Sequence, residues 1–424
     1  MKKILIIGLM VMVAAVGANA TETRVLTMGD NNNIMIDDAN VWLYPGRTFD
    51  YPNIGTGEFA SADFNKFGFT WKFGEKKPWV MGIYFSKGAA IQPMAYGDGG
   101  RQFGAFYNNT VDTIDIGGTD ILPNGYYRAM QLPDNRRLDL LYGRKIGGVN
   151  FGLNFGYVSS SVKTNEINDK AEEGFSILNF VAGLTSQTGN WDLAVGFAKG
   201  SWTDLNATGK DESEPDGYTD FSVRARLFHK LNQTITLVPH AGLAFGTHGQ
   251  KQYFGIVGAG DPIVYSFGQD TTMLKSKLTL LDAGCGMHYM PVTNILAVLD
   301  FGFQYGKIKD EYTLDVDSAA RIVNNTTTML PYWKIGLEGE VFNWLDVRFG
   351  AVSDWKSSKL ESDFVTDVKR NEAANNTYLG FGFNWNRLHV DAYTNPNLFL
   401  RGFNFISGSN EDMNFRLSAL YEMF

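Results

Sequence analysis

The sequence predicts an all-β protein, a transmembrane antiparallel up-and-down β-barrel of about 14 to 16 strands with an N-terminal plug segment in its lumen. Three observations predict this fold. Apolar and polar residues alternate along most of the chain, short turns alternate with long polar segments, and aromatic residues gather beside the short turns. The alternating runs are long enough for a membrane, since a tilted spanning strand needs about 9–11 residues.

The N-terminus has the composition of a secretory signal peptide, which we assign to residues 1–20. Lys2 and Lys3 precede an apolar run, and Ala18-Asn19-Ala20 forms a small-residue cleavage site. The apolar run is short for a spanning helix, which argues against a retained anchor. We therefore expect residues 21–56 to form the plug and residues 57–424 to form the barrel.

Charge and cysteine content restrict the possible partners and exclude one kind of cross-link. Lys and Arg number 37 against 45 Asp and Glu, a formal net charge of −8, and loss of Lys2 and Lys3 makes the mature chain more acidic. This balance argues against nucleic acid as a partner. The single cysteine, Cys285, excludes an internal disulfide, and its apolar neighbours predict an inert thiol.

The clearest β-hairpin spans residues 138–157, where two alternating runs flank Gly147-Gly148. Successive side chains of a strand point to opposite faces, so each run has one apolar and one polar face. Glycine supplies the positive φ that a two-residue turn needs. The same unit recurs along the chain, which indicates a barrel with a lipid-facing and a lumen-facing side.

The connections predict the topology. Outer-membrane barrels have short periplasmic turns and long outer loops. Seven hairpins, a first strand near residues 57–63 and a final strand give about sixteen strands, or about fourteen if a weak segment is misread. The short turns lie at 74–78, 147–148, 186–190, 230–234, 291–294, 341–344 and 384–386, and the long polar segments at 87–135, 164–173, 204–218, 247–272, 307–327, 356–376 and 395–411.

Aromatic residues beside the short turns predict a belt at one membrane surface. Trp and Tyr prefer the headgroup level, where an apolar ring and its polar tip are both solvated. The predicted belt consists of Trp79, Trp191, Tyr289, Trp344 and Trp385.

The last strand ends in Phe424, which resembles the terminal signal that the barrel-assembly machinery reads. Phe415 and Leu417 lie on the apolar face, whereas Phe424 is out of phase with them, so a local bulge is required. We expect the assembly machinery and outer-membrane lipid as partners, the bacterial outer membrane as the location, and a monomer.

Charged residues on the polar face predict a charged lumen. They can select solutes through their field, or opposite charges can pair and hold a plug, and we favour pairing. Glu338 and Arg348 flank one short turn and should therefore lie on adjacent strands. The predicted lumen charges are Arg224, Arg226, Asp300, Glu338, Glu340, Asp346, Arg348 and Arg416.

The sequence contains no catalytic or metal-binding motif, neither G-x-S-x-G nor H-E-x-x-H. His240, His288 and His389 fall on the polar face, where a lone histidine is usually a lumen residue. The acidic run 211–216 lacks the glycine spacing of a calcium loop, and Asp37-Asp38 is better suited to capping a helix than to binding a cation. We expect no enzymatic activity, cofactor or metal.

The N-terminal segment resembles the signature of the FadL/PorV-like group, the long-chain fatty-acid transporter and PorV-like barrels. That group has Met-Gly-Gly, then Asp-Asp-Ala and aromatic-Asn-Pro-Ala. Here Met28-Gly29 is followed by Asp30, and Tyr44-Pro45-Gly46 stands in place of Asn-Pro-Ala. The resemblance implies a plug inside the barrel, whose residues would include Asp37, Asp38, Trp42, Tyr44 and Pro45.

The size of the barrel and the composition of the N-terminal segment also predict a plug, independently of the resemblance. A barrel of this size leaves an aqueous channel unless it is filled, and irregular backbone is tolerated at membrane depth only inside protein or water. A disordered tail is the alternative, but tails seldom carry so many large apolar residues. We expect the interior to be lined by Ile34, Ile36, Val41, Trp42, Leu43 and Tyr44.

These features predict a channel or transporter for small solutes. The resemblance to the FadL/PorV-like group implies that these solutes include hydrophobic compounds. The alternative is a PorV-like, non-transporting scaffold or secretion-associated barrel that binds partner proteins through its outer loops. A transporter needs a continuous path through the barrel, whereas a scaffold can be packed shut.

Overall fold

In a computed structural model of the chain, the structure describes residues 21–60, 65–87, 114–115, 120–121, 136–166, 169–205, 218–254, 270–314, 320–362, 368–394 and 415–423. The predicted signal peptide, the acidic run 211–216 and Phe424 lie outside these ranges.

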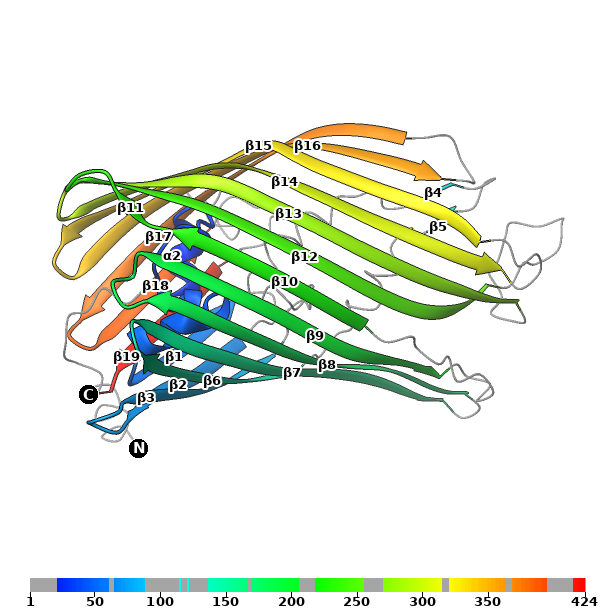
Figure 1. The fold of residues 1–424 in the computed structure, drawn as a ribbon, viewed down its shortest axis with the longest axis horizontal. Helices are drawn as coiled ribbons and strands as arrows, with labels where there is room; N and C mark the ends of the chain where they lie inside the picture. The colour runs from blue at the N-terminus through cyan, green and yellow to red at the C-terminus, as the bar shows by residue number, and fades with distance from the viewer. Residues whose placement is uncertain are drawn as a thin grey trace, which may run out of the picture.

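The described chain forms a closed antiparallel β-barrel (Figure 1). Its sheet has 17 strands, but β11 (His229–Lys230) continues β10 (Tyr218–Leu227) beyond Phe228, so the described wall has sixteen strand positions. Pairing of β1 (Ile54–Ala60) with β19 (Phe415–Glu422) closes it. The other wall strands are β2 (Asn65–Phe73), β3 (Trp79–Lys87), β6 (Arg136–Ile146), β7 (Val149–Glu166), β8 (Asp169–Ser186), β9 (Trp191–Leu205), β12 (Ile235–Phe254), β13 (Asp270–Val292), β14 (Ile295–Leu314), β15 (Ala320–Phe342), β16 (Leu345–Ser362), β17 (Val368–Trp385) and β18 (Leu388–Thr394). A separate short hairpin pairs β4 (Ile114–Asp115) with β5 (Asp120–Ile121).

The predicted short turns and the barrel class are confirmed. Each of the seven turns joins consecutive paired strands, and Gly147 has the positive φ expected of it, at 57°. We call the end of the barrel that carries these turns the turn end and the opposite end the loop end. The strand count lies at the upper limit of the prediction.

Several predicted loops were too long. β12 continues to Phe254 and β13 begins at Asp270, so much of the predicted 247–272 loop is strand. The strands likewise extend into the predicted loops at 164–173, 307–327 and 356–376. Beyond the membrane both faces of a strand meet water, so the alternation that marks a strand in the sequence fades although the hydrogen-bonded ladder continues.

The boundary between segment and barrel also differs from the prediction. β1 begins at Ile54, so Ile54 to Thr56 belong to the first strand and not to the preceding segment. The register explains this start, because Ile54 pairs with Glu422 and Gly55 with Tyr421 of the last strand. We call residues 21–53 the N-terminal segment.

The outer face of the wall is apolar and carries the predicted aromatic residues near the turn end. Tyr289, Trp344 and Trp385 are exposed there, while Trp79 and Trp191 are half-buried. Phenylalanines extend this belt by stacking on its members, with ring centroids 4.4 Å apart for Phe73–Trp79, 5.6 Å for Phe342–Trp344 and 5.6 Å for Phe383–Trp385.

The N-terminal segment lies within the barrel near the turn end (Figure 1). It forms three short helices, α2 (Glu22–Thr27), η1 (Asp38–Trp42) and η2 (Pro45–Asp50). No helix among the described residues is both long enough and apolar enough to cross a membrane. α2 lies against β16 to β19, and η2 lies against β3 and β6 to β9, so the segment crosses from one side of the wall to the other.

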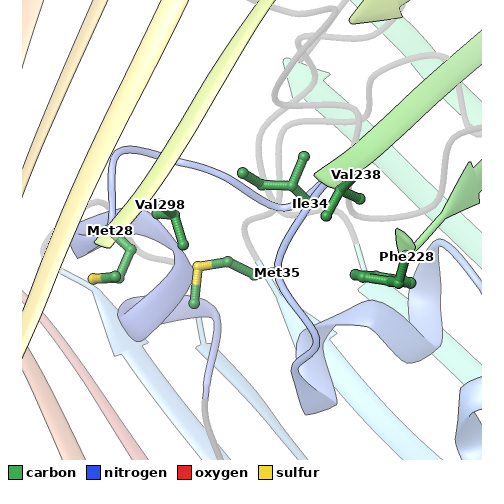
Figure 2. Packing of buried hydrophobic residues seen from close by; sticks show 6 residues of the cluster. All are labelled: Met28, Ile34, Met35, Phe228, Val238 and Val298. Carbon is green, nitrogen blue, oxygen red and sulfur yellow. The ribbon is translucent and has the colours of Figure 1, made fainter. Parts of the chain in front are cut away.

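Between α2 and η1, the segment packs its apolar residues against inward-facing residues of the wall. Figure 2 shows Met28, Ile34 and Met35 beside Val298 and neighbouring wall residues. Burying these side chains contributes roughly 1.5–3 kcal/mol each relative to leaving them exposed. The full cluster contains Met28, Ile34, Met35, Phe228, Val238 and Val298.

Candidate functional site

The candidate site is the contact between the N-terminal segment and the inner wall, beginning at α2. Thr21 caps α2, and its Oγ1 donates to Asp391 Oδ2 at 2.7 Å. The hydroxyls of Thr23 and Ser418 are hydrogen-bonded as well. The first residues of the segment are thereby fixed to the last two strands of the barrel.

Arg24 of α2 forms a two-point attachment to the wall on this side. Its Nε and Nη2 donate to the two oxygens of Glu338 at 2.6 and 2.7 Å. Burial alone would lower the pKa of Arg24, but the charge and hydrogen bonds of Glu338 outweigh burial and raise it above its ordinary value. Arg24 therefore stays charged, and paired, in the lumen.

Arg348 fixes the position of the Glu338 carboxylate, which accepts the hydrogen bonds of Arg24. It lies directly opposite Glu338 on the neighbouring strand, as predicted, and its Nε is 2.5 Å from Glu338 Oε2. It also pairs with Asp391 and lies 3.6 Å from Asp346. One fully buried guanidinium thus joins three carboxylates on three strands.

Glu22 makes a second ionic cluster at the start of α2. Its carboxylate accepts from Lys66 Nζ at 2.7 Å and from Arg416. Arg416 also donates to Glu58 at 2.6 Å. These contacts connect α2 to β1, β2 and β19, where the barrel closes.

The residues between α2 and η1 attach mainly through backbone carbonyls. Lys334 Nζ donates to the carbonyl of Asp30 at 2.8 Å, and His288 Nε2 lies 3.0 Å from the carbonyl of Ile34. Asn33 donates to Asp282 at 3.0 Å.

Arg226 is the equivalent of Arg348 on the other side of the lumen. Its Nε is 2.7 Å from Asp192, and its Nη atoms donate to the carbonyl of Met35 at 2.7 Å and to Asn40 Oδ1 at 2.9 Å. The guanidinium also lies 4.2 Å from the ring centre of Tyr44, a cation–π contact.

Arg47 of η2 completes this second network. Its Nε donates to Asp192 at 2.9 Å, and its Nη2 donates to the carbonyl of Gly189 at 3.1 Å. Asp192 therefore accepts from a wall arginine and a segment arginine together.

Asp37 and Asp38 lie buried at the start of η1. Asp37 caps the helix by accepting from the Ala39 N–H at 3.3 Å, and it pairs with Arg24 at 3.3 Å. Burial, followed by the adjacent charge of Asp37, raises the pKa of Asp38 well above its ordinary value. Burial and the neighbouring carboxylate of Asp37 together favour a proton on Asp38.

Glycines in the wall allow the segment backbone to approach it closely. A Cβ on Gly183 would lie 2.8 Å from Gly46 N, and one on Gly152 would overlap the carbonyl of Pro45. Any side chain at Gly183 or Gly152 would displace η2. Gly143 lies beside Thr48 with more room, since the nearest atoms of η2 are 3.1 and 3.2 Å from such a Cβ, and a side chain there requires a shift of only a few tenths of an ångström. Further wall glycines meet the segment, namely Gly286 beside Ile34, Gly336 beside Met28, Gly350 beside Gly29 and Gly380 beside Thr27.

A cavity of about 460 Å³ remains at the turn end beside α2. Arg24, Glu338, Arg348 and His389 line its inner side, and the turn around Trp344 lines its rim. Both charged and apolar residues line the cavity, and several of them belong to the short turns.

The structure brings most of the predicted residues to this contact. Trp42 is buried edge-on to Tyr84, with ring centroids 4.9 Å apart, and Tyr44 and Pro45 are buried beside it. Ile36, in contrast, is 43% exposed, so it is not part of the packed contact between segment and wall.

The predicted lumen charges divide into three groups. Arg226, Glu338, Arg348 and Arg416 contact the segment or its partners, and Asp346 accepts from Asn384 at 2.9 Å. Asp300 pairs with His240 at 3.0 Å within the wall, and Arg224 is buried directly opposite Gly242 in the register. Glu340 is exposed at the turn end and lines the cavity.

Sequence reasoning missed several residues that hold the segment, above all Glu22, Arg47, Glu58, Lys66 and Asp192. Asp192 follows the belt residue Trp191, so the period of two already placed it on the lumen face. Arg47 lies in an irregular segment, where no period indicates direction. No group of three or more metal-ligating side chains occurs within the described ranges.

Comparison with solved structures finds other barrels of the bacterial outer membrane at low similarity. The ferric yersiniabactin uptake receptor FyuA of Yersinia pestis has 8% identity and a TM-score of 0.37, covering 88% of this chain and 80% of that chain. The FrpB iron transporter of Neisseria meningitidis has 9% identity and a TM-score of 0.36, covering 91% and 83%. CdiB of Escherichia coli has 10% identity and a TM-score of 0.42, covering 88% and 63%.

These values do not assign the chain to any of those families. No family model matches the sequence and no curated protein is similar to it, so the resemblance to FadL and PorV-like barrels gains no support here. The architecture itself is informative. A closed antiparallel barrel with an apolar outer face and an aromatic belt is a protein of the bacterial outer membrane.

Proposed function

We propose that this protein is an outer-membrane transporter whose N-terminal segment closes the lumen at the turn end and must be displaced for a solute to pass. One observation carries the proposal: the segment lies in close contact with wall glycines on β6 to β8 and, across the lumen, on β13 and β15 to β17. A barrel of this strand number would otherwise enclose an aqueous channel.

The described inner wall favours a polar solute over the hydrophobic one that the FadL-like resemblance implied. Its inward positions carry amides, hydroxyls and paired charges, among them Asn154, Asn179 and Ser222. An apolar solute would have to displace water from these groups without replacing their hydrogen bonds, which is unfavourable.

We propose a transport role and not a catalytic one for the histidine and carboxylate at the turn end. Both nitrogens of His389 are engaged, Nε2 with Asp391 at 2.9 Å and Nδ1 with Asn384. Asp391 in turn binds Arg348 and Thr21. These contacts leave no nitrogen of His389 directed at a substrate.

A PorV-like scaffold is the second candidate, because buried ion pairs such as Arg24–Glu338 and Arg47–Asp192 would also suit a barrel that is closed permanently. In that case the barrel would present its loops to partner proteins and would pass no solute.

Liposome swelling distinguishes the two candidates. Mature protein and a variant lacking residues 21–53 would be refolded into vesicles and tested with uncharged sugars of increasing size. We expect slow, size-limited swelling from the intact protein and fast swelling from the deletion variant. Equally fast swelling with both proteins would contradict closure by the segment. Absence of swelling with both proteins would favour the scaffold. Heat-dependent electrophoretic mobility checks that each barrel is folded.

A further inference from the structure

Two asparagines of the inner wall have buried amides with no hydrogen-bond partner. Asn154 on β7 and Asn179 on β8 are both 0% exposed, and neither the Oδ1 nor the Nδ2 of either residue is bonded. Buried polar groups are nearly always hydrogen-bonded in folded proteins, so two adjacent exceptions require an explanation.

Asn154 lies beneath η1 and the residues that follow it. In the sheet register it stands between Leu141 on β6 and Val181 on β8. Leu141 packs against Val41 and Trp42, and Val181 packs against Leu43 and Tyr44. Movement of this part of the segment would therefore uncover the Asn154 amide.

Asn179 lies on the loop-end side of Asn154, and its neighbour across the strands is a glycine. It is opposite Gly156 in the register, and a Cβ on Gly156 would lie 3.6 Å from Asn179 Nδ2 and 2.8 Å from Asp139 Oδ1. Toward the turn end the same three strands carry Gly143, Gly152 and Gly183, which receive η2. The wall under η1 and η2 is thus a strip of glycines and asparagine amides, which we call the amide strip.

The two halves of the segment differ in whether the polar groups beside them have hydrogen-bond or ionic partners. At α2, Arg24 and Glu22 meet oppositely charged partners on the wall. At η1 and η2, Arg47 is equally well paired, but Asn154 beneath them and Asn179 on its loop-end side hold four unbonded amide atoms, and Thr48 Oγ1 is unbonded too. Docking of η1 and η2 therefore costs hydrogen bonds that water or a solute would restore.

We infer that η1 and η2 are the part of the segment that moves, and that the path opened along the amide strip binds an uncharged, hydroxyl-bearing solute through Asn154 and Asn179. This inference rests on the proposed transport function and adds the route and the solute class. An amide both donates and accepts, as a hydroxyl does, so the two match without a change of charge. The arginines around the strip are held by carboxylates, such as Arg137 with Asp139 at 2.7 Å and Arg47 with Asp192 at 2.9 Å.

Disulfides placed on either half test the route. In a Cys285→Ser background, Thr48→Cys with Gly143→Cys would tether η2, because a Cβ at position 143 lies 3.2 Å from Thr48 Cβ, a few tenths of an ångström below the usual range. Thr23→Cys with Ser418→Cys is the matched tether for α2, since these hydroxyls are hydrogen-bonded.

The measurement is uptake of maltotriose into vesicles that contain each tethered protein, before and after its disulfide is reduced. We expect the oxidised η2 tether to abolish uptake and reduction to restore it, while the α2 tether leaves uptake unchanged. Full uptake through the oxidised η2 tether, or block by the α2 tether alone, would overturn the inferred route. Absence of uptake in the untethered protein and in the variant lacking residues 21–53 would instead contradict the proposed function.

Substitution of the amides tests the solute class. Asn154→Leu with Asn179→Leu should lower maltotriose uptake relative to arginine and gluconate uptake by about tenfold, the effect of losing roughly 1.4 kcal/mol of hydrogen bonding. Gln304→Leu, which removes a buried inward amide on β14, is the control and should leave the ratio unchanged. An unchanged ratio in the double variant would overturn the assignment of these amides to the solute.

Discussion

Arg24 in α2 and Glu338 in β15 form a two-point ion pair, with Nε 2.6 Å from Oε2 and Nη2 2.7 Å from Oε1. The pair connects residues 314 positions apart in the sequence. The acceptor is itself fixed by Arg348 on the neighbouring strand. The pair therefore joins the first helix of the described chain to β15 and, through Arg348, to β16.

Arg24→Ala should loosen the segment without unfolding the barrel. Loss of the charged hydrogen bonds leaves Glu338 with one fewer partner, and we expect docking to weaken by about 2–3 kcal/mol. Tryptic cleavage after the buried Arg47 should become at least tenfold faster. Arg144→Ala, which alters an exposed arginine on β6 at the turn end, is the control. Cleavage as slow as in the unmodified protein would contradict the role of this pair.

Gly152→Ala should prevent η2 from seating, because the new Cβ would occupy the position of the Pro45 carbonyl. The backbone can relax only partly, and overpacking of this kind costs typically 1–3 kcal/mol. Gly339→Ala is the matched control, since nothing lies within 4 Å of a Cβ at that strand position. Heat-dependent mobility should show intact barrels for both variants, with faster cleavage after Arg47 for Gly152→Ala alone. Equal cleavage rates would show that close approach at Gly152 does not determine docking.

Docking of the segment should weaken as the pH rises, owing to Asp38. Its pKa is raised above the ordinary 3.8 by burial and by Asp37, with Glu58 adding to the effect and Lys66 opposing it. A raised folded-state pKa means that the stabilisation is complete below the ordinary pKa and is lost as pH rises through the raised value. Open probability in bilayers should therefore increase as the pH rises above the ordinary pKa of 3.8. Asp38→Asn should reduce this increase, and an identical pH profile in that variant would rule out Asp38 as its source.

Arg226→Lys should release the part of the segment around η1 despite preserving the charge. One guanidinium bonds Asp192, Asn40 and the carbonyl of Met35 together, a fork that an ammonium cannot reproduce. We expect amide hydrogen exchange in residues 31–44 to rise by about tenfold or more, a loss of at least about 1.4 kcal/mol. Arg387→Lys, which alters a single backbone contact at the turn end, should leave this exchange unchanged. Protection equal to the unmodified protein would refute the account of Arg226.

Period-two alternation predicted the barrel well, because a strand between lipid and lumen must be apolar on one side only. Phe221, Val223 and Ala225 alternate with Ser222 and Arg224 in the sequence and in the register. The same rule failed toward the loop end, where β12 and β13 continue through polar residues, since water on both sides removes the contrast that marks a strand.

The site was predictable only on the wall side. Glu338 and Arg348 could be placed opposite each other because a short turn fixes the register of its two strands. Arg24 and Arg47 could not be assigned to Glu338 and Asp192, since irregular backbone has no period that relates its side chains to distant strands. The wall glycines that admit the segment, such as Gly152 and Gly183, look the same in the sequence as any glycine of a strand.

Single-channel conductance tests closure of the lumen by the N-terminal segment most directly. Refolded mature protein and the variant lacking residues 21–53 would be recorded under identical conditions in planar bilayers. The account predicts long closed periods with brief openings from the intact protein, and steady openings from the deletion variant that match those brief openings in size or exceed them. A steady conductance of the same size from both proteins would contradict the account, because it would mean that the segment does not close the path.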